Sequence, residues 1–430
     1  MKCCKCLQEK EKCFFTTNQL KKKSGSRTCK DCVEKEPEDT IGNFLTWLQK
    51  YNVDINHICI ESVTNEFRLV RSTSFLKKNT KVIKIPKCLL MTTVAAKKLD
   101  VCKNLPARKY HNHTWLALML LTERDKGKDS FWYPYIQLLP RKLENVPLFF
   151  SQPQKEKLGQ SFVRDMIDHT FKQIEMDFNY IQGWTLADYM WARVIVITRI
   201  FGISVDGEMT EAFVPLADMC NHTPRPNTSW GFETDAFVMS CTRQIPNHVE
   251  VTDSYGAKCN SRYFVNYGFT LEKNELNNQA VLFLPHGSGN FDDGFSHYNL
   301  AIENKWESKV SQEKMSRFQF NLVKGTKSNE VTLSMFHFLR LQNATPEEIK
   351  EEKEKILSKD NELLVIEQLF KSIELRLQEI PSECTEHADI DRILKSERTV
   401  LLQFQETLHL YKRRIRFTEN IIPIFKQTFI

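Results

Sequence analysis

The sequence predicts an α+β protein, and three observations lead to that class. Short runs rich in β-branched and aromatic residues lie between about 55 and 91 and again from 212 to 285. Apolar residues at helical spacing dominate 110–200 and the chain beyond about 300. The first 36 residues instead hold six cysteines and few large apolar side chains. The expected order is a small cysteine-rich unit, strands, helices, strands and helices.

Composition narrows the class of protein further. The chain has 430 residues, of which 41% are hydrophobic and 27% charged, so it is long enough for two or three globular domains. No apolar run approaches the ~18 residues that span a bilayer, and the Cys- and Lys-rich start is not a signal peptide. We therefore expect no membrane contact, a monomer, and a location in the cytoplasm and/or nucleus.

Periodicity predicts the individual elements. Ile41, Phe44, Leu45 and Leu48 have the spacing of a helix over 41–51. Alternation predicts strands at 67–70 and 82–85. Further helices are expected at 111–125, 153–178, 185–200, around 363–370 and at about 390–416.

Four short motifs stand out between these elements. The insertion-like run Ser-Phe-Trp-Tyr-Pro-Tyr-Ile-Gln-Leu-Leu-Pro occupies 130–140. The run Phe-Val-Pro-Leu-Ala-Asp-Met-Cys-Asn-His occupies 213–222, and the pair Tyr255-Gly256 follows. The segment Asn-Tyr-Gly-Phe then occupies 266–269.

In this order the motifs resemble the SET-domain protein methyltransferases, in the branch typified by the Rubisco large-subunit methyltransferase. The resemblance implies a SET β-fold with a pseudoknot and a helical insertion, followed by an all-α domain that binds substrate. It covers roughly 41–425, and we expect domains at 1–36, 41–290 and 295–430, with the insertion at about 100–205.

The resemblance also implies a reaction and a cofactor. Such enzymes transfer a methyl group from S-adenosylmethionine to a protein side chain, so the implied partner is a protein substrate. A free lysine amine has a pKa near ~10.4 and must be neutral to react, which burial and a nearby sulfonium charge favour. Methyl transfer needs few acid–base residues, so motifs built from Asn, His and Tyr are sufficient for this reaction.

The resemblance, and not the residue pattern by itself, implies catalytic and cofactor-binding roles for particular residues. Tyr255 would face the reacting methyl as the catalytic tyrosine, and Asn260 matches an asparagine that follows this Tyr-Gly pair. The cofactor would be bound by Arg199, Asp218, Asn221, His222, Tyr255 and Tyr267, with Tyr267 placed on the last strand.

The chain departs from the family pattern where a Gly-rich segment is usual. The matching run is Asn65-Glu66-Phe67-Arg68-Leu69-Val70, with Glu66 and Arg68 at positions that are usually glycine. These side chains would crowd the methionine end of the cofactor, or Arg68 would pair with its carboxylate. The segment 249–254 is also more polar than the usual strand before the tyrosine.

The target side chain is judged from Phe201, Ala217 and Tyr267. Relatives that methylate lysine resemble this chain in an aromatic at the first position and a small residue at the second, whereas the branch that methylates histidine in actin carries Asn and Trp. We therefore favour a protein-lysine N-methyltransferase. A protein-histidine methyltransferase and an inactive SET scaffold that recognises protein or nucleic acid stay open.

The N-terminal cysteines predict a metal site. Cys3 and Cys6 form one CxxC pair, and Cys29 and Cys32 form a second pair 22 residues further on. Two such pairs are the pattern of a Cys4 zinc site, here a small zinc ribbon with structural Zn²⁺. The lysines at 21–23 leave open a contact of this zinc finger with nucleic acid or with protein. We expect no structural disulfides.

Overall fold

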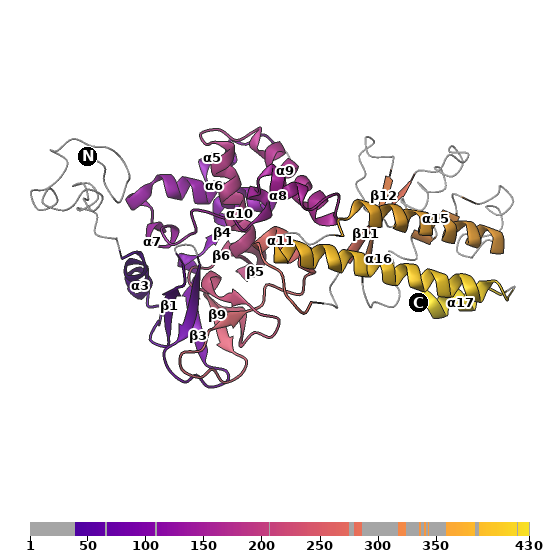
Figure 1. Ribbon diagram of the computed structural model, residues 1–430. Helices are drawn as coiled ribbons and strands as arrows, with labels where there is room; N and C mark the ends of the chain where they lie inside the picture. The colour runs from indigo at the N-terminus through magenta and orange to yellow at the C-terminus, as the bar shows by residue number, and fades with distance from the viewer. Residues whose placement is uncertain are drawn as a thin grey trace, which may run out of the picture. The chain divides into compact units, whose positions relative to one another are not determined.

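The computed structural model describes 39–64, 67–107, 110–205, 207–274, 279–285, 317–323, 335–336, 339–340, 343, 358–382, 387–418 and 420–429. The chain forms two compact units, coloured by residue number in Figure 1. Unit 1 comprises 1–94, 119–140 and 201–253, and unit 2 comprises 95–118, 141–200 and 254–430. The domain boundaries expected from the sequence stay a prediction, because each unit combines segments that are distant in the chain.

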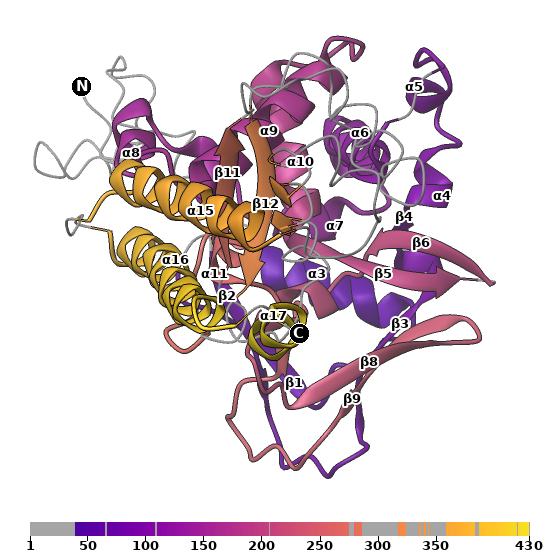
Figure 2. The same cartoon turned by 90° about the vertical axis from the view of Figure 1, so that its right-hand side faces the viewer.

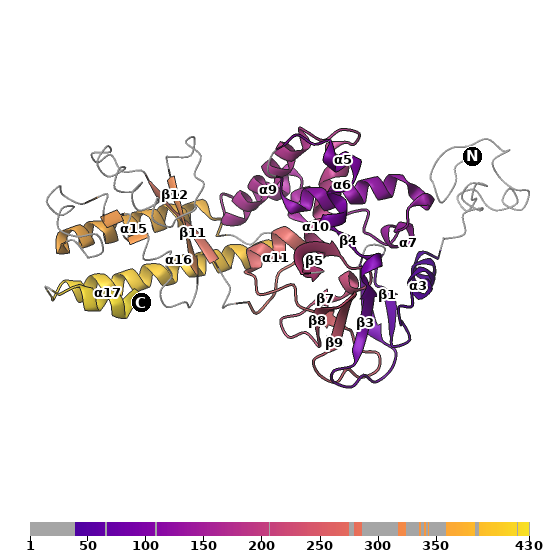
Figure 3. The same ribbon diagram turned by 180° about the vertical axis from the view of Figure 1, so that it is seen from behind.

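Unit 1 is built mainly from short strands. Its strands are β1 Ile58–Ser62, β2 Arg68–Ser72, β3 Lys81–Pro86, β4 Met91–Thr92, β5 Ile200–Val205, β6 Glu208–Phe213, β7 Asn221–His222, β8 Thr228–Glu233, β9 Ala236–Cys241 and β10 Thr252–Asp253. They form two three-stranded sheets, β3-β9-β8 and β4-β6-β5, and two pairs, antiparallel β1-β2 and parallel β7-β10. Figure 3 shows β7, β8 and β9 of this unit.

The burial pattern explains why these segments form strands. In β3 the apolar Val82, Ile83 and Ile85 are buried while Lys81 and Lys84 are exposed. The neighbouring strand β9 is buried along almost its whole length. A helix, α3 Thr40–Lys50, adds Phe44 and Leu48 to the core. The helix expected at 41–51 and the strands expected at 67–70 and 82–85 are thus confirmed.

Unit 2 is mainly helical. Its helices are α5 Asp100–Lys103, α8 Gln152–Glu156, α9 Phe162–Phe178, α10 Leu186–Arg199, α11 Asn260–Tyr267, α15 Lys359–Glu379, α16 Ala388–Ile415 and α17 Ile422–Phe429. The chain crosses between the units within α4 Thr93–Ala96 and α6 Asn112–Asp125, and the short helix α7 Tyr133–Ile136 belongs to unit 1. Among the described residues, no helix has the length and apolar character needed to cross a membrane.

Two expectations for the helical regions need correction. The single helix expected at 153–178 is divided into α8 and α9, with Gly159 between them at a φ of +55°. The chain beyond 295, expected to be all helical, contains strand β12 Arg317–Val323, which pairs antiparallel with β11 Gln279–Pro285. Figure 2 shows this pair beside α15 and α16. Ala280, Leu282 and Leu284 of β11 are buried in alternation, which explains the strand.

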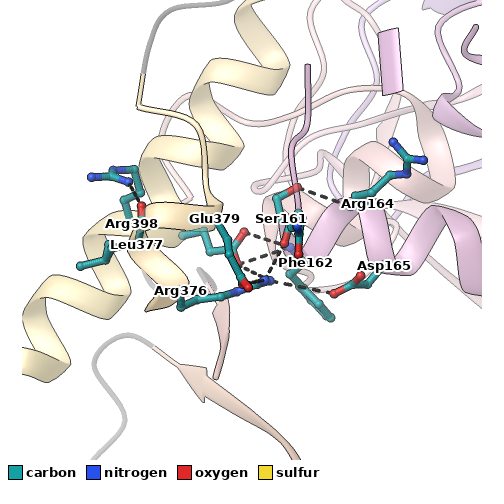
Figure 4. A network of polar contacts seen from close by, with 10 residues as sticks. Ser161, Phe162, Arg164, Asp165, Arg376, Leu377, Glu379 and Arg398 are labelled. Carbon is teal, nitrogen blue, oxygen red and sulfur yellow. Dashed lines mark hydrogen bonds and ion pairs between the residues drawn. The ribbon is translucent and has the colours of Figure 1, made fainter. Parts of the chain in front are cut away.

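A buried polar network ties α9 to α15 and α16 within unit 2. The carboxylate of Glu397 accepts a hydrogen bond from the Phe162 main-chain N–H at 3.1 Å. Arg376 Nη2 donates to Glu397 Oε1 at 3.2 Å, and Arg376 Nη1 donates to the carbonyl of Gln160 at 2.5 Å. Glu379 and Asp165 also face Arg376, as Figure 4 shows. One buried ion pair thus satisfies the start of α9.

Candidate functional site

A strained turn precedes the Asn-His pair in unit 1. Leu216 has φ +77° and ψ −50°, the conformation of a rare γ-turn with positive φ, although it is fully buried. The Asp218 N–H donates to the Val214 carbonyl at 3.1 Å and holds the turn closed. Such strain costs about 1–3 kcal/mol for a non-glycine residue and concentrates at functional sites. This turn therefore marks the segment as a candidate site.

The insertion-like run at 130–140 is anchored by hydrogen bonds within the same unit. The hydroxyl of Ser130 donates to Glu123 Oε2 at 2.6 Å, and the indole N–H of Trp132 donates to the Leu89 carbonyl at 2.9 Å. Tyr135, which is fully buried, donates its hydroxyl to Asp218 Oδ2 at 2.7 Å. The structure therefore brings this motif together with Asp218.

Asn221 and His222 form the two-residue strand β7. They pair in parallel with Thr252 and Asp253 of β10. The side-chain amide of Asn221 donates to Glu250 Oε1 at 2.8 Å and, more weakly, to the Arg68 carbonyl at 3.3 Å. With its side-chain N–H groups used in this way, Asn221 fixes β7 against β2 and the segment before β10.

Sequence reasoning missed two residues of this arrangement, Glu250 and Asn227. The amide of Asn227 donates to the Glu250 carbonyl at 2.8 Å, and its side-chain oxygen accepts from the Thr252 N–H at 2.9 Å. The available signal was the unusual polarity of 249–254. Those polar residues form the bonds that hold β10 beside β7.

The surroundings of Cys220 show that this part of unit 1 carries negative charge. Burial raises the pKa of the Cys220 thiol well above its usual value, and the carboxylates of Asp253, Asp218 and Glu250 raise it further. The cysteine is therefore a neutral core residue and not a nucleophile. The three carboxylates around it favour a ligand that carries positive charge.

Arg68 occupies the place where a glycine was expected. Its Nη1 donates to the carbonyl of Leu138 at 2.7 Å, so one arm of the guanidinium is bound to the main chain of unit 1. Glu66, the other unusual residue, lies outside the described residues. The bond to Leu138 gives Arg68 a structural partner that the sequence did not predict.

The Tyr255-Gly256 pair lies in unit 2, and both of its carbonyl groups are bound. The ammonium of Lys258 donates to the Tyr255 carbonyl, and the hydroxyl of Tyr263 donates to the Gly256 carbonyl at 2.6 Å. Gly256 has a φ of +87°, a region in which glycine is favoured. The pair is therefore held by its main chain, which leaves the Tyr255 ring to be placed by its neighbours.

An aromatic cluster surrounds Tyr255. The ring centroids of Tyr255 and Tyr267 are 4.8 Å apart, and Phe269 lies 6.4 Å from Tyr255 and 6.0 Å from Tyr267. Burial raises the pKa of Tyr267 to about 12, with a further contribution from Tyr263. The Tyr267 phenol is thus neutral at physiological pH and able to donate a hydrogen bond.

Tyr267 was expected on a strand, but it is the last residue of helix α11. The helix ends because Gly268 takes a left-handed conformation at a φ of +76° and its N–H bonds back to the Phe264 carbonyl at 2.8 Å. Asn260 at the start of α11 is buried and binds the Leu271 main chain at 2.9 and 3.0 Å. Gly268 and Asn260 therefore both have structural roles.

Arg199, Phe201 and Ala217 complete the predicted set. Arg199 is the last residue of α10 and is half-buried. Phe201 on β5 packs edge-to-face on Trp230 and Phe237, at 5.3 and 5.0 Å. Ala217 is fully buried at the start of a 3-10 turn. The structure thus gives Phe201 a packing role in the core of unit 1.

The predicted site residues fall into two groups. Asp218, Asn221 and His222 lie in unit 1, and Arg199, Tyr255 and Tyr267 lie in unit 2. Asp218, Asn221 and His222 lie on one short segment of unit 1, and Tyr255 and Tyr267 are brought together in unit 2 by their ring contact.

The predicted zinc ligands Cys3, Cys6, Cys29 and Cys32 lie outside the described residues, so the zinc ribbon stays a prediction. Within the part of the chain that the structure describes, no group of three or more His, Cys, Asp or Glu side chains could hold a metal ion.

Comparisons with known sequences identify a region that contains the motifs at 130–140, 213–222 and 255–256. Residues 67–256 match the family model described as the SET domain. SET domain-containing protein 4 of Artemia parthenogenetica is 26% identical over 255 residues, which cover 55% of this chain and 62% of that protein. Actin-histidine N-methyltransferase of Homo sapiens is 26% identical over 260 residues, which cover 55% of this chain and 43% of that protein. The match thus spans less than two thirds of either relative.

Comparisons with solved structures show the fold. The SET domain of LSMT bound to lysine and AdoHcy has a TM-score of 0.72 at 18% identity, covering 89% of this chain and 93% of that chain. Rubisco LSMT bound to AdoMet has a TM-score of 0.71 at 19% identity, covering 88% and 93%. The expected SET β-fold, with helices and a C-terminal helical region, is therefore confirmed.

Proposed function

We propose that this chain, which carries the SET fold and matches the SET-domain family over 67–256, is an S-adenosylmethionine-dependent protein methyltransferase that acts on lysine. The observation that carries the proposal is the content of the matched region. It begins one residue before Arg68, ends at the Gly256 of the Tyr-Gly pair, and includes the strained turn with Asn221. The solved structures with this fold include one bound to AdoMet, which supports the choice of cofactor.

The residues of unit 1 fit such a cofactor chemically. S-adenosylmethionine carries positive charge on its sulfonium and its ammonium, and the carboxylates of Asp218, Glu250 and Asp253 gather around Cys220. Asn221 and His222 would contribute main-chain groups, because the Asn221 amide is already bonded to Glu250. By the resemblance, Arg199 would attract the cofactor carboxylate. When bound, the cofactor supplies the electrophilic methyl group.

In this proposal Tyr255 and Tyr267 prepare the acceptor amine. Burial among Tyr255, Tyr267 and Phe269 disfavours the ammonium form, so the amine lone pair becomes available for transfer. The Tyr255 hydroxyl orients the amine, and its main chain is held by Lys258 and Tyr263. Because the phenol of Tyr267 is neutral, it orients the acceptor without adding a charge.

The choice of lysine rests on the apolar Phe201 and the small Ala217, which suit an aliphatic stem. A second candidate function, protein-histidine methylation, is favoured by the relatives named actin-histidine N-methyltransferase. An imidazole has polar atoms on two sides and needs a partner to orient it, for which Phe201 provides no hydrogen-bonding group. Lysine is therefore the first proposal and histidine the second.

The test is the transfer of labelled methyl from S-adenosylmethionine into the proteins of a cell extract. Wild type should label discrete bands. Tyr255→Phe should reduce the initial rate of labelling by about 10-fold or more, because it removes a group that orients the acceptor in the transition state. A tenfold lower rate corresponds to an increase of about 1.4 kcal/mol in the activation free energy. Tyr180→Phe is a matched control, since Tyr180 is 45% exposed. Mass spectrometry of the labelled bands then identifies lysine or histidine as the acceptor.

Calorimetry separates enzyme from scaffold. A measurable heat on titration with S-adenosylmethionine, together with labelling that depends on Tyr255, is the expected result. Labelling equal in wild type and Tyr255→Phe would remove the catalytic role of Tyr255. No heat and no labelling would favour a scaffold that recognises protein or nucleic acid.

A further inference from the structure

Lys258 places a positive charge at the edge of the aromatic cluster of Tyr255, Tyr267 and Phe269. Lys258 is half-buried. Its Nζ donates to the main-chain carbonyl of Tyr255 and lies 5.8 Å from the centroid of the Tyr267 ring. It is therefore close to both tyrosines that the proposed function assigns to the acceptor.

The glycine of the Tyr-Gly pair makes room for this amine. A Cβ atom at position 256 would lie 3.2 Å from Lys258 Nζ, nearer than such contacts usually are. Gly256 has a φ of +87°, a region that favours glycine, and the absence of a Cβ leaves room for the amine in its present position. The motif therefore accommodates the Lys258 amine beside the Tyr255 carbonyl.

Nothing among the described residues neutralises this charge. No ion pair joins Lys258 to a carboxylate in the part of the chain that the structure describes. The groups that the structure places against it are the Tyr267 ring, the main-chain carbonyl of Tyr255 and the guanidinium of Arg262. Burial lowers the pKa of Lys258, and the positive charge of Arg262 lowers it further.

A like charge beside an ionisable group disfavours the charged form of that group. An acceptor that approaches Tyr255 and Tyr267 as a cation would meet Lys258 at short range, whereas the neutral amine or imidazole would not be repelled. The same charge would not hinder an acceptor that has already lost its proton.

We propose that Lys258 is a positioning residue for methyl transfer: it fixes the Tyr255 main chain and, through its charge, favours the deprotonated acceptor. This inference rests on the proposed function, in which the acceptor side chain lies against Tyr255 and Tyr267. It adds to that function a specific source of acceptor deprotonation that does not require a general base.

The test is the pH dependence of the initial labelling rate, with labelled S-adenosylmethionine and the most strongly labelled protein of a cell extract. Wild type is compared with Lys258→Arg, which keeps the charge, and Lys258→Met, which removes it. The acidic limb for Lys258→Met should move to higher pH by on the order of one unit, because the acceptor is then protonated more readily. Lys258→Arg should keep the limb of wild type. Lys258→Gln replaces Lys258→Met if the latter does not fold.

The outcomes are distinguishable. A lower rate for Lys258→Met with an unshifted limb, or equal shifts for Lys258→Met and Lys258→Arg, would assign Lys258 a purely structural role and overturn the inference. Calorimetry should give the same S-adenosylmethionine affinity for all three proteins. Absence of labelling by wild type at every pH would overturn the proposed function, and this inference with it.

Discussion

The hydroxyl of Tyr135 donates a hydrogen bond to Asp218 Oδ2 at 2.7 Å, and both side chains are buried. Tyr135 belongs to the run at 130–140 and Asp218 to the turn before Asn221, 83 residues further along the chain. The bond connects two motifs that the sequence presents as separate. It provides a buried carboxylate with a neutral donor directly beside the strained Leu216 turn.

Replacement of Tyr135 by Phe should therefore destabilise the protein. The change removes a hydrogen bond to a charged group, and such bonds contribute about 1.5–3 kcal/mol. We expect a corresponding fall in the free energy of unfolding, measured by denaturant unfolding followed by circular dichroism. Tyr133→Phe in the same helix, where the side chain is half-buried, is the matched control. Equal stability of the two variants would argue against the importance of this bond.

Gly268 should resist substitution more strongly than Gly183, another glycine with positive φ. A Cβ at Gly268 would lie 2.6 Å from both the Nδ2 and the main-chain oxygen of Asn145, in addition to the strain of a φ of +76°. Gly183 has a φ of +90° but no atom within 4 Å of such a Cβ. Gly183→Ala should thus show only the backbone cost of about 1–2 kcal/mol.

Gly268→Ala should lower the free energy of unfolding by about 1–3 kcal/mol more than this backbone cost, because the added Cβ overpacks against Asn145. The melting temperatures of the two variants provide the comparison. If both melt at the same temperature, the contact of Gly268 with Asn145 does not limit the end of α11.

The network at the start of α9 predicts a dependence of stability on pH. Burial raises the pKa of Glu397 from 4.5 to about 7, although Arg376 and the Phe162 N–H lower it. The folded state therefore binds more protons than the unfolded state between these values. The contribution of Glu397 to the free energy of unfolding is fully present below pH 4.5 and is lost as the pH rises through about 7.

Glu397→Gln should flatten this part of the stability profile, since glutamine does not titrate. The difference in free energy of unfolding between wild type and the variant should change by up to about 1.4 kcal/mol per pH unit in this window. Thermal unfolding of both proteins at about pH 5, 6 and 7 would measure this change in the difference. Glu406→Gln on the exposed face of α16 is the control. Parallel profiles for wild type and Glu397→Gln would contradict the assignment.

Asn221→Ala should weaken the binding of S-adenosylmethionine. The change removes the bonds to Glu250 Oε1 and to the Arg68 carbonyl that fix β7, so its main-chain groups would no longer be held for the cofactor. We expect a loss of about tenfold in affinity, or ~1.4 kcal/mol, by calorimetry. The exposed Asn56→Ala should bind as wild type does. An unaltered dissociation constant for Asn221→Ala would count against this pocket.

The zinc prediction concerns residues outside the described part of the chain. Purified protein should contain about one equivalent of zinc, the number expected for one Cys4 site, and Cys29→Ser should reduce it. Cys13→Ser, which changes a cysteine outside the two CxxC pairs, should not. A full equivalent of zinc in Cys29→Ser, by plasma mass spectrometry, would refute the proposed ligand set.

Local patterns account for most of the secondary structure. The helix α3 begins where the Asp39 side chain accepts from the Gly42 N–H, and its apolar spacing is visible in the sequence. Prediction failed where a single residue changes the chain direction, as at Gly159, or where pairing is distant, as in β12. Tyr267 was placed on a strand because a motif identifies a residue and not the element that carries it.

The sequence by itself determined the SET fold, the order of its motifs and the candidates Asn221 and Tyr255, because these depend on residue type and spacing along the chain. Only the tertiary structure decided that Asn221 is held by Glu250 and by Arg68, 153 residues away, and that Lys258 lies beside Tyr267. The physical reason is that a hydrogen bond or a charge contact depends on distance and direction in space. The order of residues along a chain does not specify these before the chain is folded.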